Sequence, residues 1–412
     1  MGQAIPRPDM PVPQPKPQTP PPDQPRRDNR PSVGFGGIEL SFKLGGPKKT
    51  PEETLLEPTL DMRNAPITDA IEGQVLFFLA PPASGAARIA AACRLTILET
   101  SPLDALGTTM ILARFAPPIT IESAQACLAR QPQVQSSQPN FLYQVLGGGS
   151  RARGYALHGL RDGNLTPVTG TIVMIDTAVD LGHANLRASG MAQYYVDVPQ
   201  TPSAHGTAIA ELLVGGGNYP GTALGANLIS LAAFAPAGEQ TWLSQSSSLA
   251  KALNATIILE PQVVNMSFGR ARSDPIMVRG LDALHTKGVC VVAAAGNGSS
   301  GPVQFPASNP ASLAVTAVDG RLRPYAYASR GPEISVAAWG VGLAAAVPGG
   351  RRSVSGTSFA TAVVSGSLLR MPECNGRRDP AGMKAKAMTN AQDLGERGAD
   401  PVFGAGLFRL TR

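Results

Sequence analysis

The feature that most constrains this chain is a series of short, nearly unbroken apolar runs in its C-terminal half. The runs cover residues 171–175, 227–234, 263–268 and 289–295. A strand with one face in water alternates apolar and polar residues, whereas a continuous apolar run fits a parallel strand buried on both faces. Helical stretches lie between these runs or after them, at residues 209–214, 247–258 and 276–287. The pattern predicts an α/β domain over residues 155–412, with a mostly parallel sheet, helices on both faces and functional groups beyond the carboxyl ends of the strands.

The region before this domain has a different pattern. It contains strand-like and helical segments in the order β-α-β-β-α-β, at residues 75–79, 83–94, 95–98, 108–115, 121–130 and 141–146. This order is that of the split βαβ or ferredoxin-like arrangement, and it predicts a small α+β domain over residues 71–147. The segment Gly147-Gly148-Gly149-Ser150-Arg151 then ends all periodicity. We therefore expect an exposed, protease-sensitive linker over residues 148–154.

Residues 1–70 are expected to be a disordered tail or linker. Eleven of the first 31 residues are Pro, and such a segment favours extended polyproline conformation and builds no core. A recognition role for the Pro-rich stretch is the alternative. Residues 1–50 hold eight Lys or Arg against four Asp or Glu, which gives +4 of the formal net charge of +6. Because the rest of the chain is close to neutral, we expect no nucleic-acid partner.

The four cysteines are too few for a disulfide-dense scaffold. Cys93 and Cys127 lie in one region, and Cys290 and Cys374 lie in the other, so each region has room for one bridge. Cys290 sits inside the apolar run 288–295, so we expect it to be a buried free thiol. The state of Cys93 and Cys127 stays open.

The sequence predicts no membrane span, because no window of about 18 uninterrupted apolar residues exists. The start Met1-Gly2-Gln3-Ala4 has no basic segment followed by an apolar core. Either the sequence lacks its export signal or the protein is not exported.

Three residues stand out as candidates for chemistry. Asp176 directly follows the first apolar run, His205 opens a helical stretch, and Ser358 starts a helix of small residues. Singly, each is explained as a turn or capping residue or as a histidine at a helix N-terminus. Together they provide a hydroxyl nucleophile, a base to activate it and an anion to orient the base. No Gly-x-Ser-x-Gly segment occurs in the chain, which argues against an esterase of the α/β-hydrolase fold.

The motifs around these residues resemble those of subtilisin-like serine proteases, the subtilases. Asp, His and Ser occur in that chain order, which is the order in subtilisin. The matching stretches span nearly all of residues 155–412 and read Ile175-Asp176-Thr177-Ala178-Val179-Asp180, His205-Gly206-Thr207, Val264-Asn265-Met266-Ser267-Phe268-Gly269, Ala294-Ala295-Gly296-Asn297 and Ser355-Gly356-Thr357-Ser358-Phe359-Ala360.

The resemblance implies a role for each matched position. Ser358 would attack the scissile carbonyl, His205 would carry the proton, and Asp176 would orient the imidazole. Asn297 would stabilise the oxyanion. Substrate would be bound as an added strand along Ser267, Phe268 and Gly269, with small residues, including Ala295 and Gly296, lining the main specificity pocket. Arg351 and Arg352, shortly before Ser358, either favour acidic residues after the cut or form a solvated loop.

The resemblance also bears on metals and cofactors. No cofactor is implied, and residues 215–220 are short where several relatives build a calcium loop. Calcium is therefore possible but not supported by a clear loop, although Asp180 matches one family ligand position. The remaining histidines, His158, His183 and His285, lack metal-ligand spacing and are expected to be structural.

The small domain would be the family's propeptide, an intramolecular inhibitor whose residues 141–146 occupy the cleft. The enzyme would then cut itself within residues 146–154. A permanent accessory domain is the alternative for residues 71–147. For the whole chain we expect a secreted or periplasmic endopeptidase acting on peptides or proteins, and a catalytically silent or permanently inhibited binding module of the same fold is the alternative.

Overall fold

The computed structural model describes residues 70–145, 165–187, 189–217, 219–237 and 241–410. These described residues all lie in one compact unit. Apart from Ala70, the predicted tail 1–70 lies outside the described residues, and so does the predicted linker 148–154.

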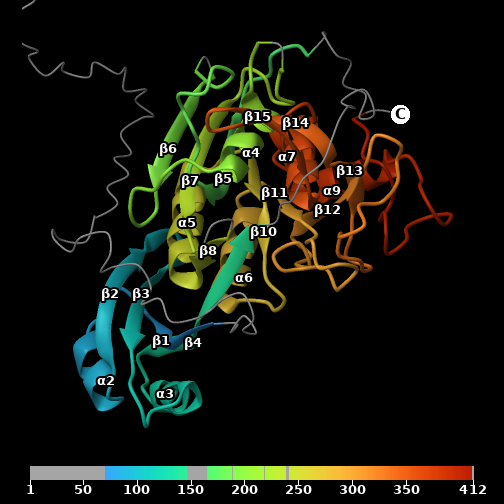
Figure 1. Cartoon of the computed structure of the whole chain (residues 1–412). Helices are drawn as coiled ribbons and strands as arrows, with labels where there is room; N and C mark the ends of the chain where they lie inside the picture. The colour runs from blue at the N-terminus through green and yellow to red at the C-terminus, as the bar shows by residue number, and fades with distance from the viewer. Residues whose placement is uncertain (1–69, 146–164, 188, 218, 238–240, 411–412) are drawn as a thin grey trace, which may run out of the picture. The chain divides into compact units, whose positions relative to one another are not determined.

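A large sheet forms the centre of the C-terminal domain (Figure 1). Its parallel strands lie in the order β13-β12-β11-β9-β5-β7, with β6 beside β7. Four of them match the predicted runs: β5 (Thr171–Thr177), β7 (Asn227–Pro236), β9 (Val263–Met266) and β11 (Cys290–Ala294). Three further strands were not predicted from the sequence: β6 (Met191–Tyr195), β12 (Ser312–Val318) and β13 (Val336–Trp339). The mostly parallel sheet is thus confirmed.

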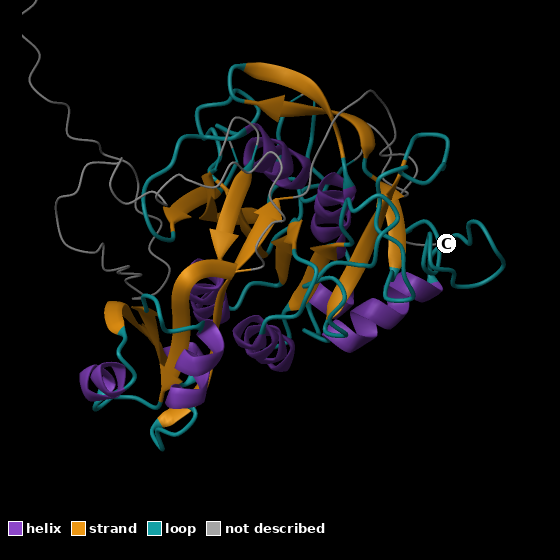
Figure 2. Ribbon diagram, turned by 60° about the horizontal axis from the view of Figure 1, so that its bottom comes forward, coloured by secondary structure: helices purple, strands orange, loops and turns teal. Residues whose placement is uncertain are grey.

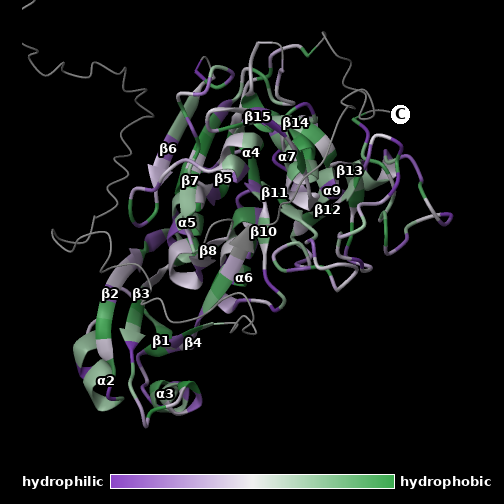
Figure 3. Cartoon of the chain, viewed as in Figure 1, coloured by the Kyte–Doolittle hydropathy of each residue, from purple (hydrophilic) through white to green (hydrophobic). Residues whose placement is uncertain are grey.

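Helices cover both faces of this sheet, as predicted (Figure 2). Ile172 and Met174 of β5 pack on the side of α4 (Ala204–Val214), α7 (Thr357–Leu368) and α9 (Pro380–Thr389). The alternate residues Val173 and Ile175 pack on the side of α5 (Ser246–Leu259) and α6 (Pro275–Thr286). Figure 3 shows these strands mainly in the hydrophobic colour. Both faces are dry, so polar groups collect where the strands end.

The small domain has its elements in the predicted order β-α-β-β-α-β. They are β1 (Ala70–Leu79), α2 (Ala86–Ala92), β2 (Thr96–Leu103), the 3-10 turn η1 (Asp104–Leu106), β3 (Thr108–Arg114), α3 (Ile121–Leu128) and β4 (Val134–Val145). The strands form an antiparallel sheet in the order β4-β1-β3-β2. β4 starts at Val134, earlier than the predicted strand at 141. The first half of this strand is polar, so the sequence gave no apolar pattern from which its start could be predicted.

The sheet of the small domain is buried on both faces. Val75, Phe77 and Leu79 of β1 pack with residues of α2 and α3. Leu76 and Phe78, on the opposite face, belong to the same apolar cluster as residues of α5 and α6. Because both faces of this antiparallel sheet carry large apolar side chains, a second face left in water would expose apolar area. The small domain is therefore docked on the large domain through this second face.

An ion-pair cluster adds to this docking. Lys251 Nζ on α5 lies 2.5 Å from Glu99 Oε1 on β2 and 2.8 Å from Asp197 Oδ1. Burial by itself lowers the pKa of Lys251, but the charges of Asp197 and Glu99 outweigh it and leave this pKa raised. The ammonium group therefore stays charged at neutral pH and links the two domains.

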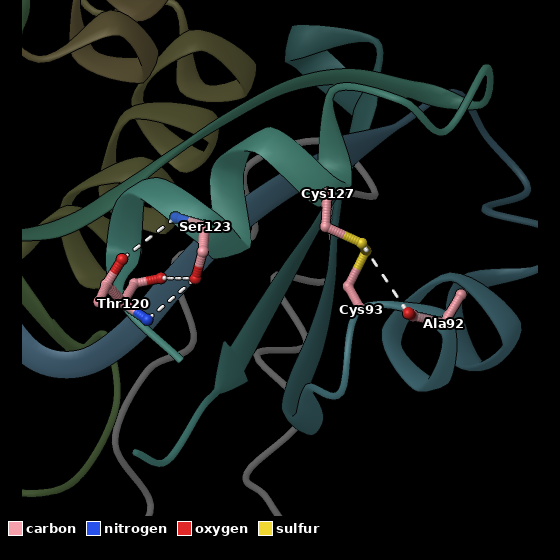
Figure 4. Close-up of a disulfide and its surroundings, with 5 residues drawn as sticks. All are labelled: Ala92, Cys93, Thr120, Ser123 and Cys127. Carbon is pink, nitrogen blue, oxygen red and sulfur yellow. Dashed lines mark hydrogen bonds between the residues drawn. A yellow bond between two sulfur atoms is a disulfide. The ribbon is translucent and has the colours of Figure 1, made fainter. Parts of the chain in front are cut away.

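Two disulfides staple the fold. Cys93 and Cys127 join the end of α2 to the C-terminal end of α3, and the Thr120–Ser123 capping box lies at the other end of α3 (Figure 4). Cys290 on β11 is bonded to Cys374 on α8 (Pro372–Asn375), with the Cα atoms 6.0 Å apart. The expectation of a free thiol at Cys290 was wrong, because the sequence does not reveal that α8 packs against β11. Within the described residues, none of the helices combines the length and the hydropathy of a membrane span.

The Cys290–Cys374 disulfide should stabilise the large domain. We expect the variant Cys290→Ala/Cys374→Ala to lose about 2–4 kcal/mol of unfolding free energy, because the bridge closes a long loop in the unfolded chain. The two cysteines are 84 positions apart in the sequence. Urea unfolding followed by tryptophan fluorescence, in a Ser358→Ala background, measures the loss. Unchanged stability, or free thiols titrated at these positions in the unfolded non-reduced chain, would contradict the bridge.

Candidate active site

Asp176 and His205 form a hydrogen-bonded pair. Asp176, the penultimate residue of β5, is fully buried. Its Oδ1 accepts hydrogen bonds from His205 Nδ1 at 2.8 Å, from Thr177 N at 2.7 Å and from Thr177 Oγ1 at 3.0 Å. Its Oδ2 is buried without a hydrogen-bond partner among the described residues. A base whose Nδ1 is fixed on a carboxylate has its Nε2 directed away from that carboxylate, where it can exchange a proton.

The segment around His205 explains how α4 comes so close to β5. Ser203 caps the helix, and its Oγ accepts from Gly206 N at 3.2 Å. Gly206 N also donates to Thr177 Oγ1 at 3.0 Å. A Cβ on Gly206 would collide with the backbone carbonyl oxygen of Thr177. Glycine is therefore needed next to His205 for the imidazole to reach Asp176.

Ser358 lies in the first turn of α7, in the same region. Its Oγ donates to the carbonyl oxygen of Ser267 at 3.1 Å, and the side chain is buried. The ring of the next residue, Phe359, has its centroid 5.6 Å from that of His205. The structure thus brings the ends of β5 and β9 and the starts of α4 and α7 together, as expected where parallel strands end.

A buried chain of hydrogen bonds holds the backbone of Ser358. Ser365 Oγ donates to Asn265 Oδ1 at 3.0 Å, Asn265 Nδ2 donates to Ser267 Oγ at 3.0 Å, and Ser267 Oγ donates to Ser358 O at 3.1 Å. All four residues are fully buried. The roles of Asn265 and Ser365 were not predicted from the sequence, since a single polar residue in an apolar run carries no signal of its partner.

Asn297 is tied to the start of α7. Its Oδ1 accepts from Thr357 N at 3.2 Å and from Thr357 Oγ1 at 3.0 Å. Gly296 N donates to the same Thr357 Oγ1 at 3.2 Å. With its oxygen turned to Thr357, Asn297 presents its amide nitrogen as a donor on the other side, and no acceptor for that nitrogen occurs among the described residues. Ser358 directly follows Thr357, so this donor lies beside the nucleophile candidate.

The predicted substrate-binding segment forms a strand edge. Phe268 and Gly269 make up β10, which pairs antiparallel with Val145 and Gln144 of β4. On its other side β4 pairs with β8 (Trp242–Gln245), where Tyr143 faces Ser244. The end of β4 is therefore the middle strand between β8 and β10. A segment of the chain's own small domain thus occupies the place predicted for a bound peptide.

The residues predicted to line a pocket have a neighbour that the sequence analysis missed. Ala295 is fully buried, and Gly296 adopts φ +113°. A Cβ on Gly296 would lie 2.8 Å from Gln304 Cγ, and one on Gly269 would lie 2.7 Å from Gln304 Oε1. The Gln304 side chain therefore lies between Gly269 and Gly296. Its Oε1 is buried and has no hydrogen-bond partner among the described residues.

Arg351 is neither free for substrate nor part of a solvated loop. It lies on β15 (Gly350–Ser355), which pairs with β14 (Val341–Val347), and its guanidinium forms an ion pair with Glu211 of α4. The same guanidinium lies 3.6 Å from the ring centroid of Tyr219. Glu211 also accepts from Asn185 Nδ2 at 2.6 Å and from Ala346 N at 2.7 Å. This cluster links the helix that carries His205 to the strand that precedes Ser358.

Metal ligands do not gather at Asp180. Its Oδ1 accepts from Gly182 N at 3.0 Å. Over the part of the chain that is described, no group of three His, Cys, Asp or Glu side chains is arranged to hold a metal ion. His183 Nε2 lies 2.9 Å from the carbonyl oxygen of Gly350, and His285 is exposed at the end of α6. His158 lies outside the described residues.

Comparison with known families and sequences gives a consistent result. The model of the Subtilase family matches residues 169–406. Subtilisin amylosacchariticus of Bacillus subtilis subsp. amylosacchariticus is 30% identical over 204 residues, which cover 48% of this chain and 53% of that protein. Alkaline elastase YaB of Bacillus sp. (strain YaB) is 29% identical over 248 residues, 58% of this chain and 64% of that protein. The chain spans about half the length of subtilisin amylosacchariticus and of subtilisin J.

Solved structures share the fold. Fervidolysin from Fervidobacterium pennivorans, described as a keratinolytic enzyme related to subtilisin, matches with a TM-score of 0.72 and 20% identity, over 84% of this chain and 61% of that one. The prenylagaramide maturation protease PagA matches with a TM-score of 0.52 and 23% identity, over 58% of this chain and 90% of that one.

Removing the cation from the Glu211 cluster should destabilise the site. We expect Arg351→Met to lower the unfolding free energy by about 2–3 kcal/mol, because it leaves a buried carboxylate without its cation. The loss should stay below that of a fully buried pair, since 24% of the Arg351 side chain is exposed. Thermal unfolding of the variant, compared with that of Arg352→Met at the exposed neighbouring position, measures the effect. Equal melting temperatures for the two variants would contradict it.

Proposed function

The chain belongs to the subtilase family, and on this premise we propose that it is a serine endopeptidase whose triad is Ser358, His205 and Asp176. The observation that carries the proposal is the 2.8 Å hydrogen bond between buried Asp176 and His205, at the point where the helix of Ser358 begins. A buried carboxylate that fixes one imidazole nitrogen is the arrangement that a hydroxyl nucleophile needs for activation.

In the proposed mechanism His205 accepts the proton of Ser358 Oγ as that oxygen bonds to the carbonyl carbon of the substrate. Asp176 keeps Nδ1 protonated and stabilises the imidazolium that forms. The proton then passes to the leaving amine as the C–N bond breaks. Water, activated by the same imidazole, hydrolyses the acyl-enzyme. Apart from substrate and water, these steps use only groups of this chain.

The proposed oxyanion hole consists of Asn297 and the backbone N–H of Ser358. The contact of Asn297 Oδ1 with Thr357 supports this role, because it holds the amide nitrogen of Asn297 beside the start of α7. The N-terminus of α7 adds a positive dipole end near the developing charge. Preorganised donors of this kind stabilise the oxyanion without reorganising during the reaction.

We propose that substrates bind as a strand between β8 and β10. The edges that the end of β4 now uses, Leu243–Gln245 and Phe268–Gly269, would then supply main-chain hydrogen bonds to the substrate. Main-chain pairing gives affinity for any extended peptide, and side-chain pockets give preference. Ser267 directly precedes Phe268 of this edge, and its carbonyl oxygen accepts a hydrogen bond from Ser358 Oγ. A peptide paired along this edge would therefore run past the nucleophile.

The small domain would act as a propeptide and intramolecular inhibitor. Two observations support this: the end of β4 fills the place of a substrate strand, and the second face of the small sheet is buried on α5 and α6. In addition, the fold likeness to fervidolysin covers 84% of this chain, beyond the stretch 169–406 of the family model. The proposed self-cleavage lies within residues 146–154, just beyond the end of β4.

We propose a secreted or periplasmic location. Two disulfides, Cys93–Cys127 and Cys290–Cys374, support it, because such bonds persist in oxidising compartments.

The competing function is a catalytically silent or permanently inhibited binding module. Covalent labelling by a fluorophosphonate probe separates the two, since only an activated Ser358 reacts, and comparing the full chain with the processed protein reveals inhibition by the small domain.

Self-processing should require Ser358. We expect wild-type protein to separate into two fragments with a junction within residues 146–154 and Ser358→Ala to stay at full-length mass, because the variant lacks the nucleophile. Intact-mass spectrometry of the purified proteins measures this. Ser299→Ala, at an exposed position, serves as a control and should process like wild type. Identical full-length masses for wild type and Ser358→Ala would count against self-processing.

Asn297→Ala should lower turnover much more than substrate binding. A donor that acts only on the oxyanion stabilises the transition state and not the ground state. For the corresponding asparagine of subtilisin itself the known loss in kcat is about 100- to 1,000-fold, and we expect a loss of that order here. Steady-state kinetics on a peptide substrate would separate kcat from KM. An unchanged kcat would remove Asn297 from the proposed site.

A further inference from the structure

Tyr143 of β4 fills a pocket made by the large domain. It is 1% exposed and lies on the part of β4 that pairs with β8, facing Ser244. Its ring meets the ring of Phe268 edge-on, with centroids 5.8 Å apart, and lies 5.7 Å from the guanidinium carbon of Arg270. Its hydroxyl donates a hydrogen bond to Asp274 Oδ2 at 2.9 Å. The pocket thus has aromatic and cationic walls and a carboxylate at its base.

Asp274 depends on β4 for its hydrogen bonds. It is fully buried at the N-cap of α6, and no cation forms an ion pair with it among the described residues. Gln138 Nε2 and Ile276 N donate to Oδ1, at 2.7 and 3.2 Å, and Ser246 Oγ donates to Oδ2 beside the Tyr143 hydroxyl. Two of these four donors, Gln138 and Tyr143, belong to β4. When β4 leaves, the buried carboxylate loses half of its partners.

We propose that this pocket makes the enzyme selective for peptides that carry a tyrosine at the position of Tyr143, with Asp274 as the specificity residue. The inference rests on the proposed function, because it requires that substrates follow the path of β4. A tyrosine supplies the hydroxyl donor that Asp274 lacks when β4 is gone. A phenylalanine would cover the carboxylate without replacing the donor that the Tyr143 hydroxyl provides, and the loss of a donor is costly for a buried charge.

Other side chains fit this pocket less well. Asp and Glu would bring a second negative charge against Asp274, which like-charge repulsion disfavours. Lys and Arg could pair with Asp274, but Arg270 forms a wall of the same pocket and would repel them. Leucine fills the apolar part but does not replace the donor that the Tyr143 hydroxyl provides to Asp274. Tyrosine combines an aromatic body for Phe268 with a polar tip for Asp274.

The test compares peptides that copy residues 138–150 and carry Tyr, Phe or Leu at position 143. With the processed enzyme we expect kcat/KM for the Tyr peptide to exceed that for the Phe peptide by about 10- to 100-fold, the range for a hydrogen bond to a charged group. In Asp274→Asn this ratio should fall to a few-fold, because the neutral amide bonds the hydroxyl less strongly. Asp379→Asn, the same substitution at the N-cap of α9, is the matched control and should keep the full ratio.

A second arm needs no catalysis. In full-length Ser358→Ala, we expect Tyr143→Phe to speed amide hydrogen exchange about 10-fold or more in residues 142–144 and 243–245, because β4 is held less tightly. Tyr327→Phe, which removes an exposed hydroxyl, should leave this exchange unchanged.

The outcomes separate the two proposals. Equal kcat/KM for the Tyr and Phe peptides, or a full ratio retained in Asp274→Asn, would overturn the selectivity. If no peptide is cleaved and Ser358 is not labelled by a fluorophosphonate, the proposed function fails instead. In that case the exchange arm decides whether the pocket recognises tyrosine, and unchanged exchange in Tyr143→Phe overturns the inference.

Discussion

The burial of Asp176 is the constraint on which the arrangement of the site depends. A carboxylate without solvent access is tolerated only where donors converge on it, because an unpaired buried charge costs several kcal/mol. Here three donors meet at Oδ1, one from His205 and two from Thr177. To bring His205 there, α4 must begin against the end of β5, which only a glycine at position 206 permits. α4 in turn packs in the same apolar cluster as α7, the helix whose first turn carries Ser358.

A second buried carboxylate, Asp274, links the two domains by the same physics. In contrast to Asp176, it draws part of its hydrogen bonds from outside its own domain, through Gln138 and Tyr143 of β4. Its polar contacts lie beside an apolar contact of the small sheet with α5 and α6. The apolar contact gives the small domain affinity without much directional preference, whereas the hydrogen bonds of Asp274 fix where β4 runs. The hydrogen bonds of Gln138 and Tyr143 to Asp274 therefore help to fix the register in which β4 pairs with β8 and β10.

Much of the large sheet and of the site could be predicted from the sequence, because buried parallel strands are continuous apolar runs and because Asp176, His205 and Ser358 stand in recognisable motifs. The rest depended on contacts between distant segments. The first half of β4 carries Gln138 and Asn140, which are buried and form hydrogen bonds with Asp274, Gln245 and Ser247 of the large domain. Cys290 was predicted to be a free thiol in the core, because the sequence does not show that the fold brings α8 and its Cys374 next to β11. The positions of Gln304 and Asp274 in the site could not be predicted, since an isolated polar residue in the sequence does not indicate which side chains it will contact.

Under the proposed function, β4 acts both as an inhibitor and as the first substrate. As an inhibitor β4 must bind tightly, and as a model of substrate it must occupy the site in a cleavable register. Before cleavage the strand is tethered, so its local concentration is high and modest contacts keep the site filled. After cleavage the contacts of the sheet, Lys251 and Asp274 remain, but the small domain becomes a separate molecule whose binding depends on its concentration. Dilution, or degradation of the small domain, then releases the enzyme. Under the proposed function, the contacts of the sheet and of Lys251 thus set when the protein becomes active, whereas the contact of Asp274 also sets what it cuts.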